Sequence, residues 1–259
     1  MAQIGAPAAA PSSSPTSRPG VVARMKDALR PLEPYFPTFA RAPSWGPALH
    51  VLQQHGFWPE TVFDIGVGFG TWGLYRAFPS ALYHLIEPTR ESLPYMERLS
   101  RRLRCLIHPV ALGDHEGEAT LEIRADIQGS TLLEEVGPRD VLRFDRVPLR
   151  RFDSLIRAFE RPALCKIDVQ GAELMVLEGM GERIAEIDVF IVETSTIATV
   201  KGGAEMADVV GLLGEHGFVV ADIVGMKRRP LDGATAQVDL LFVREDAALR
   251  ADRRWARTA

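Results

Sequence analysis

The sequence predicts an α/β fold in which a doubly wound, mostly parallel sheet is covered by helices on both faces. From residue 61 onward, short apolar runs alternate with stretches of helical periodicity. These runs are apolar throughout rather than alternating with polar residues, which is typical of strands buried on both faces. The last two runs are separated only by a loop, so we expect a final antiparallel hairpin.

Seven apolar runs are the predicted strands, and four stretches between them are the predicted helices. Residues 114–150 depart from this alternation and predict two short strands joined by a long connection. A loop of that length inside a compact domain is often functional. The strands are expected at 61–66, 82–88, 104–113, 164–169, 189–194, 218–224 and 238–245, and the helices at 70–78, 89–103, 172–180 and 204–216.

One main domain is expected at residues 61–245, flanked by less regular segments. Residues 1–20 are rich in Ala, Pro and Ser, which predicts a disordered tail. Residues 21–60 form an N-terminal segment with helices expected at 21–30 and 48–56, separated by a proline-broken loop. Residues 246–259 are rich in Arg and predict a polar tail.

Composition favours an ordinary globular protein and disfavours nucleic acid as the main partner. The 259 residues carry a net charge of −4 at a pI near 5.9, whereas phosphate backbones require a basic surface. Cys105 and Cys165 lie outside any ligand spacing, which fits a reducing compartment. No apolar run reaches the roughly 18 residues of a membrane helix. The N-terminus also lacks signal-peptide features, so a cytoplasmic location is expected.

The first predicted strand runs into a glycine-rich loop that two kinds of cofactor site share. Gly68, Gly70 and Gly73 match the G-x-G-x-x-G dinucleotide fingerprint. That match starts two residues late, because the fingerprint places its first glycine directly at the end of the strand. The same loop also spells D-x-G-x-G-x-G from Asp64 onward, which is a frequent pattern of methyl-donor sites.

Asp64 favours the methyl-donor hypothesis. A carboxylate at the carboxyl edge of the sheet suits a cationic amino-acid cofactor such as S-adenosylmethionine, and glycines allow its close approach. Glu87, after the second strand, is placed to accept hydrogen bonds from ribose hydroxyls in either kind of site. The structural alternative is that Asp64 only caps the following turn.

A second cluster of ionisable residues follows the fourth predicted strand. Lys166 and Asp168 are two residues apart, and so on one side of the strand, and Glu173 lies in the first turn of the next helix. Burying such groups requires a reason. The alternatives are a structural ion pair of Lys166 with one of the carboxylates and a functional site.

Several segments in the same order resemble the FkbM-type methyltransferases, which use S-adenosylmethionine. They are "VFDIGVGFGTWGL", "LIEP", "PVALGDHEGEATL", "VPLRRFDSL", "LCKIDVQGAELMVLEGM", "FIVETS" and "VDLLFV", and they span about residues 61–243. The resemblance implies the class I methyltransferase fold, a Rossmann-like, mostly parallel seven-stranded sheet. It also implies methylation of a hydroxyl on a small molecule, sugar or glycolipid, with a glycan or small-molecule acceptor as partner.

The same resemblance implies roles for individual residues. The glycine loop would frame the donor's amino-acid end and ribose, Glu87 would hold the ribose, and "ALGD" would lie beside the adenine. Val67–Gly68 and Gln170 depart from the family, which commonly has Ala-Asn and Glu at these places. The cofactor-binding residues implied in this way are Asp64, Gly66, Gly68, Gly70, Glu87, Leu112, Asp114 and Asp168.

The catalytic hypothesis gives Asp168 or Glu173 the task of base or acceptor-orienting group, with Lys166 tuning their pKa values. A divalent metal held by Asp168, Glu173 and Glu193 is a further possibility, but no His or diagnostic spacing supports it, so no metal site is predicted. Two alternative functions stay open, a NAD-dependent oxidoreductase and a non-catalytic module that binds the donor. The oligomeric state is not predicted.

Overall fold

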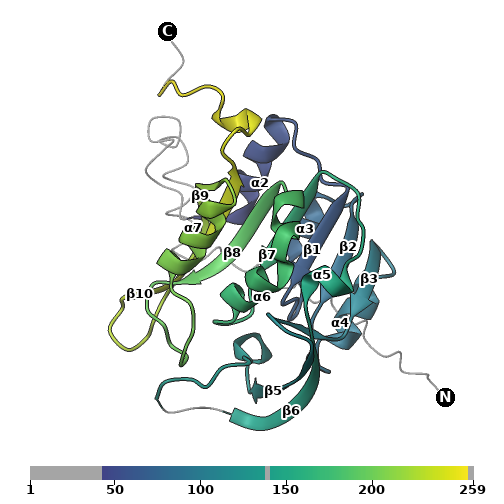
Figure 1. The fold of residues 1–259 in the computed structure, drawn as a ribbon, viewed down its shortest axis with the longest axis vertical. Helices are drawn as coiled ribbons and strands as arrows, with labels where there is room; N and C mark the ends of the chain where they lie inside the picture. Colours follow the sequence, from purple (N-terminus) through teal and green to yellow (C-terminus); the bar gives the residue numbers. More distant parts are fainter. Residues whose placement is uncertain (1–42, 138–140, 256–259) are drawn as a thin grey trace, which may run out of the picture. The chain divides into compact units, whose positions relative to one another are not determined.

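The computed structural model describes residues 43–137 and 141–255 (Figure 1). Its centre is a seven-stranded sheet with the order β3-β2-β1-β7-β8-β10-β9. All pairs from β3 to β8 are parallel, and β10 lies antiparallel between β8 and β9. The predicted sheet and its final antiparallel hairpin are therefore confirmed. The strands are β1 (Thr61–Ile65), β2 (Leu82–Ile86), β3 (Arg104–His108), β7 (Ala163–Ile167), β8 (Val189–Ser195), β9 (Phe218–Arg228) and β10 (Thr235–Arg244).

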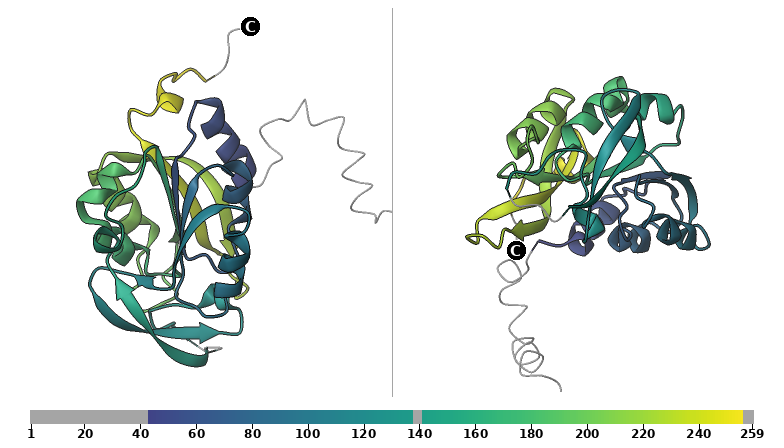
Figure 2. Two further views of the ribbon diagram at one scale, coloured as in Figure 1. Left: turned by 90° about the vertical axis from the view of Figure 1, so that its right-hand side faces the viewer. Right: turned by 90° about the horizontal axis from the view of Figure 1, so that it is seen from below.

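Helices cover both faces of this sheet, as Figure 2 shows. Their buried residues divide into two clusters, because successive strand residues point to opposite faces. Val62 and Leu164 face α2, α3 and α4, whereas Phe63 and Ile167 face α5, α6 and α7. The helices are α2 (Trp45–Gln54), α3 (Trp72–Ala77), α4 (Leu93–Leu99), α5 (Phe152–Leu155), α6 (Glu173–Met180) and α7 (Met206–Glu215).

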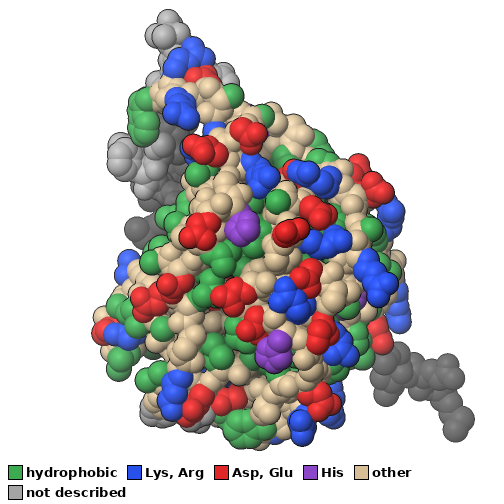
Figure 3. Space-filling model, in the orientation of Figure 1, with side chains coloured by type: hydrophobic (Ala, Val, Ile, Leu, Met, Phe, Trp, Pro, Cys, Tyr) green, Lys and Arg blue, Asp and Glu red, His purple; other side chains and the backbone are tan. Residues whose placement is uncertain are grey.

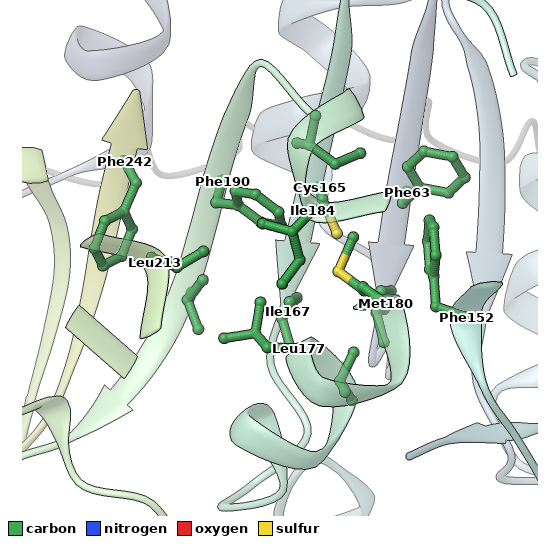
Figure 4. Close-up of a cluster of buried hydrophobic side chains, with 14 of the residues drawn as sticks. Phe63, Phe152, Cys165, Ile167, Leu177, Met180, Ile184, Phe190, Leu213 and Phe242 are labelled. Carbon is green, nitrogen blue, oxygen red and sulfur yellow. The ribbon is translucent and has the colours of Figure 1, made fainter. Parts of the chain in front are cut away.

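The two clusters together explain why the central strands are apolar throughout, because each covers one face of the sheet. Figure 4 shows side chains of α6 and α7 packing onto β1, β7 and β8. Met180 and Leu213, which are fully buried, meet Cys165 and Phe190 there. Each such buried side chain contributes roughly 1.5–3 kcal/mol. Cys165 is thus a small core residue, and neither cysteine forms a disulfide.

A second, three-stranded sheet corrects two predictions. The strand predicted at 104–113 divides at Pro109, which lacks an N–H group for pairing. The residues after it, β4 (Ala111–Leu112), join β5 (Gly117–Arg124) and β6 (Val141–Arg150) in the order β4-β6-β5. The predicted excursion over 114–150 is therefore a long antiparallel pair with its own core, and its strands are eight and ten residues long rather than short.

The flanking segments are described only in part. The helix predicted at 21–30 and the tail predicted at 1–20 lie outside the described residues. The helix predicted at 48–56 begins earlier, at Trp45, because Pro47 is tolerated in a first helical turn. Beyond β10 the chain forms one short 3₁₀ turn, η4 (Ala248–Arg250).

Acidic and basic side chains are interspersed over the face drawn in Figure 3, with no extended area of one sign. Within 43–137 and 141–255, no helix combines the length and apolar character needed to cross a membrane.

Candidate functional site

The carboxyl ends of β1, β2, β7 and β8 meet at one edge of the large sheet. Ile65 lies beside Ile86 on one side and Ile167 on the other, so the three loops that follow these residues are neighbours. Ligands of open α/β sheets bind at this edge. Two pockets open there, and they share Gly66, Gln128, Asp168 and Gln170 among their lining residues.

The glycine loop after β1 is packed tightly against the loop after β7. Gly66 has φ +78°, and a Cβ added there would lie 1.8 Å from the carbonyl oxygen of Asp168. The Gly66 N–H donates to Ile86 (2.9 Å), and the Asp168 N–H donates to Ile65 (3.1 Å). Only glycine satisfies both the backbone conformation and the close approach.

Asp64 does not face either pocket. Its side chain is fully buried, and it accepts hydrogen bonds from Thr71 Oγ1 (2.9 Å) and from the Tyr75 hydroxyl. Lys166 Nζ lies 3.5 Å from the same carboxylate. Burial and the neighbouring Asp64 raise the pKa of Tyr75 far above its usual range, so the phenol stays a donor. In this arrangement Asp64 holds the glycine loop and the start of α3 together.

The first pocket, called here the narrow pocket, encloses about 60 Å³ between β1, β2 and β4. Glu87 lines it and accepts hydrogen bonds from the N–H groups of Gly68 (3.0 Å) and Thr89 (2.9 Å). Leu112 lines it as well, together with other apolar side chains of β2, β5 and the short turn η2 (Ile127–Gly129). An acidic group at one end and apolar walls at the other suit a nucleoside.

Asp114, in contrast, lies outside the narrow pocket. Its side chain is 43% exposed and contacts His115 Nδ1 at 2.7 Å. The hydrogen bond from His115 lowers the pKa of Asp114. Its carbonyl oxygen accepts from Arg151 (2.6 Å). Of the predicted "ALGD" contacts, the structure brings Leu112 to the pocket and leaves Asp114 at the surface.

Asp168 lines both pockets, and its side chain is one-third exposed. Lys166 Nζ lies 3.6 Å from Asp168 Oδ2 and also donates to the carbonyls of Ile65 (3.2 Å) and Gly66. Burial alone would raise the pKa of Asp168, but the ammonium groups of Lys166 and Lys227 outweigh it and lower the pKa. The group is therefore a carboxylate at neutral pH.

Glu173 lies beneath the loop that carries Asp168 rather than in a pocket. It is buried, and it accepts hydrogen bonds from the N–H groups of Val169 (3.0 Å) and Gly171 (3.0 Å). Burial raises its pKa to about 7, although these N–H groups oppose the shift. Lys166 pairs with Asp64 and Asp168, and within the described residues it forms no ion pair with Glu173.

Gln170 links two carboxylates across the second pocket. Its amide nitrogen donates to Asp168 Oδ1 (2.7 Å) and to Glu193 Oε2 (2.7 Å). The residue has φ +56°, which is uncommon outside glycine and is a form of backbone strain that clusters at functional sites. Its carbonyl accepts from Thr131 Oγ1 (2.8 Å), which helps to hold this conformation.

Glu193 is the centre of a network that the sequence analysis did not anticipate. Lys227 Nζ and Gln237 Nε2 donate to it at 2.7 and 2.8 Å. Burial and the neighbouring Asp168 raise the pKa of Glu193. Asp239 stands opposite Glu193 in the β10–β8 register, and burial raises its pKa too. Gln237 and Asp239 interrupt an otherwise apolar strand, which is the signal that would have found them.

The second pocket, called here the polar pocket, has a volume of about 650 Å³. Carboxylates, lysines and two tryptophans surround it, and Trp72 is half exposed. Within 43–137 and 141–255, no group of three or more His, Cys, Asp or Glu side chains is arranged to hold a metal ion. The oxygens considered for a metal are occupied otherwise, because Gln170 and Lys227 contact Glu193 while Glu173 contacts backbone.

The fold and this edge define the class of protein. A glycine loop after β1, an acidic residue after β2 and an antiparallel β10 between β8 and β9 are the arrangement of a Rossmann-like class I methyltransferase. A family model described as the methyltransferase FkbM domain matches residues 64–220, which is more than half of the chain. The chain belongs to this methyltransferase family, and the predicted resemblance is confirmed.

Solved structures of other methyltransferases are similar at low sequence identity. Methyltransferase FkbM from Methylobacillus flagellatus KT is 18% identical, with a TM-score of 0.43 over 70% of this chain and 43% of that chain. Magnesium protoporphyrin IX methyltransferase from Synechocystis PCC 6803 is 13% identical, with a TM-score of 0.42 over 77% of each chain. A Burkholderia thailandensis 1,6-didemethyltoxoflavin-N1-methyltransferase is 17% identical, with a TM-score of 0.39 over 92% and 95%. The chain thus spans less than half of the first of these, and no curated protein matches it.

Proposed function

We propose that the protein transfers a methyl group from S-adenosylmethionine to a hydroxyl group of a small molecule, sugar or glycolipid. The observation that carries the proposal is the position of Asp168, which borders both the narrow pocket and the polar pocket. A group at this boundary contacts the donor on one side and the acceptor on the other. Family membership supports the donor, and the polar lining of the larger pocket supports a hydroxylated acceptor.

The residues of the narrow pocket fit the donor. Glu87 has free lone pairs for the ribose hydroxyls, since each carboxylate oxygen accepts one backbone N–H and has capacity for another donor. Leu112 and Ile127 offer apolar surface to the adenine. Gly66 and Gly68 line the narrow pocket and place no side chain between it and the donor's amino-acid end. Because the enclosed space is small, the turn η2, whose Gln128 side chain covers Gly68, has to move outward when the donor enters.

When bound, the donor supplies a methyl group on a sulfonium, so the protein's main task is alignment of the acceptor oxygen. Asp168 accepts the hydroxyl hydrogen, orients the oxygen and takes its proton as the new bond forms. Gln170 fixes the positions of the Asp168 and Glu193 carboxylates relative to each other, because its amide donates to both. Lys166 keeps Asp168 ionised. Glu173 acts as a positioning residue, through the loop N–H groups that it binds.

The test compares Asp168→Asn with Asp222→Asn, a control that changes an exposed carboxylate of β9 outside both pockets. Removal of a general base costs about 10²–10⁴-fold in rate. We expect Asp168→Asn to lose at least about 100-fold in turnover over a panel of hydroxylated acceptors, with S-adenosylhomocysteine still bound in calorimetry. The control is expected to retain its activity.

The outcomes distinguish the alternatives. Calorimetric binding of NADH instead of S-adenosylhomocysteine would favour an oxidoreductase. Binding of S-adenosylhomocysteine without turnover on any acceptor would favour a donor-binding module. Full activity of Asp168→Asn would show that another group takes the proton. Loss of activity after treatment with a chelator would add a metal that this proposal does not include.

A further inference from the structure

A second cavity adjoins the polar pocket, and its walls carry basic side chains from two distant parts of the chain. It has a volume of about 280 Å³ and shares Gln170 and Lys227 with the polar pocket. Arg124 lines it from the end of β5, and Arg228 and Arg229 line it from the β9–β10 hairpin. We call this space the basic cavity.

The basic cavity has more positive charge than its partners neutralise. Arg228 donates only to the carbonyl of Gly233 (3.0 Å), and among the described residues it has no carboxylate within ion-pair distance. The other three cations have one carboxylate each, in the pairs Arg124–Glu135 (2.7 Å), Lys227–Glu193 (2.7 Å) and Arg229–Asp232 (2.5 Å).

Arg124 adds an unused donor to this charge. Its Nε is buried, and no atom of the described residues accepts a hydrogen bond from it. A buried donor without a partner is uncommon in folded proteins and calls for an explanation. A guanidinium group presents a planar fork that matches the oxygens of carboxylates and phosphates.

The walls of the cavity are tied together rather than loose. The segment after β5 pairs with the segment after β8, since the Val136 N–H donates to Thr199 (2.8 Å) and the Lys201 N–H donates to Glu134 (2.7 Å). Thr131 joins the same wall to Gln170 (2.8 Å). The segment that carries Arg124 is therefore connected to the loop that holds Asp168.

We propose that the basic cavity binds an oxyanion group of the acceptor, phosphoryl or carboxylate, while the hydroxyl to be methylated lies against Asp168 in the polar pocket. This inference rests on the proposed function and narrows its acceptor to an anionic, hydroxylated molecule. Gln170 and Lys227 border both spaces, so one molecule can extend past them from one space into the other. Arg228 supplies the charge that is free to be neutralised, and Arg124 supplies the free N–H.

The test uses the full chain and the Arg Nε–H resonances in ¹⁵N NMR spectra. Inorganic phosphate and acetate are titrated separately at constant ionic strength, and the Arg124 resonance is assigned by its disappearance in Arg124→Gln. We expect that resonance to shift along a saturable curve. Hydrogen bonds to charged groups contribute enough for Arg228→Gln to weaken binding about tenfold. The tighter of the two anions identifies the phosphoryl or the carboxylate group.

Arg146→Gln is the matched control, because Arg146 lies on β6 with 77% of its side chain exposed and lines none of these spaces. Equal weakening by Arg146→Gln and Arg228→Gln, or no shift with either anion, would overturn the proposal. Titration with S-adenosylhomocysteine is run on the same samples. Nucleoside binding without anion binding removes the subsite and leaves the proposed function. Anion binding without nucleoside binding removes the proposed function, and with it the acceptor, and leaves only an anion site.

Discussion

Replacement of Lys166 by methionine tests the charge balance beneath the site. Lys166 is buried and lies 3.5 Å from Asp64 and 3.6 Å from Asp168, and Asp64 has no exposure to solvent. The variant removes the cation that contacts both carboxylates. Removing one partner of a buried ion pair costs about 3–5 kcal/mol. For a domain of this size, 1 kcal/mol shifts the melting temperature by about 2–4 °C. We therefore expect Lys166→Met to melt roughly 6–20 °C below the parent protein.

Chemical denaturation at several pH values gives the sharper readout. In Lys166→Met, the folded-state pKa of Asp168 should rise above the unfolded value near 3.9. A carboxyl group with a raised pKa is most stable when protonated, so the deficit of the variant should shrink as the pH falls toward about 4. Lys201→Met is the control, since its ion pair with Glu134 is exposed and should cost less than about 1 kcal/mol. A loss below about 1 kcal/mol for Lys166→Met, or a deficit independent of pH, would refute the reasoning.

Two further predictions concern the glycine loop and the histidines of β2 and β3. Gly66→Ala should lower the free energy of unfolding by about 3 kcal/mol or more and abolish binding of S-adenosylhomocysteine. The added Cβ would collide with the Asp168 carbonyl, and residue 66 has φ +78°, which strains any residue other than glycine. The control Gly214→Ala has open space around its Cβ and should be neutral or stabilising in the same denaturation assay. Burial and His108 lower the pKa of His84 to about 4. The unfolded chain takes up this proton near pH 6.5, so stability should fall as the pH drops from 6.5 to 4, and His84 should contribute about 3 kcal/mol to that fall. His84→Asn should reduce that slope, of which His108 supplies the remainder because burial lowers its pKa too, and a parent protein with no slope would contradict the assignment.

The order of strands and helices could be predicted because burial on both faces leaves a direct mark on the sequence. The division of the third run could not, since apolar residues continue on both sides of Pro109 although the chain changes sheets there. Periodicity reports that a strand has buried residues, and it does not report which sheet buries them. For the same reason, the predicted strands at 218–224 and 238–245 miss the part of β9 and β10 nearest the hairpin turn. The residues there are mostly polar, although they pair with each other at the edge of the sheet.

The candidate site divides in a similar way. Strand ends placed Glu87 and Asp168 at the ligand edge, since carboxyl ends of parallel strands converge. Asp64 was placed correctly on β1, but its side chain turns beneath the loop toward Thr71 and Tyr75. The direction of a side chain near a strand end depends on the donors that fold around it. Those donors come from the next helix, whose position a sequence pattern does not fix.

The role of Gln170 follows from its contacts and could not be inferred from the sequence motif alone. In the sequence, Gln170 stands where the family commonly has a glutamate, so a carboxylate is missing there. In the structure, the amide is the donor that allows two carboxylates, Asp168 and Glu193, to stand on either side of it. A third carboxylate there would need a proton or a cation to be stable. The substitution is therefore consistent with the residues around it, where β10 contributes Gln237 as a further amide donor to Glu193. The β9–β10 hairpin that supplies Gln237 also supplies Lys227, so the last two strands contribute both a cation and an amide donor to the carboxylates of the polar pocket.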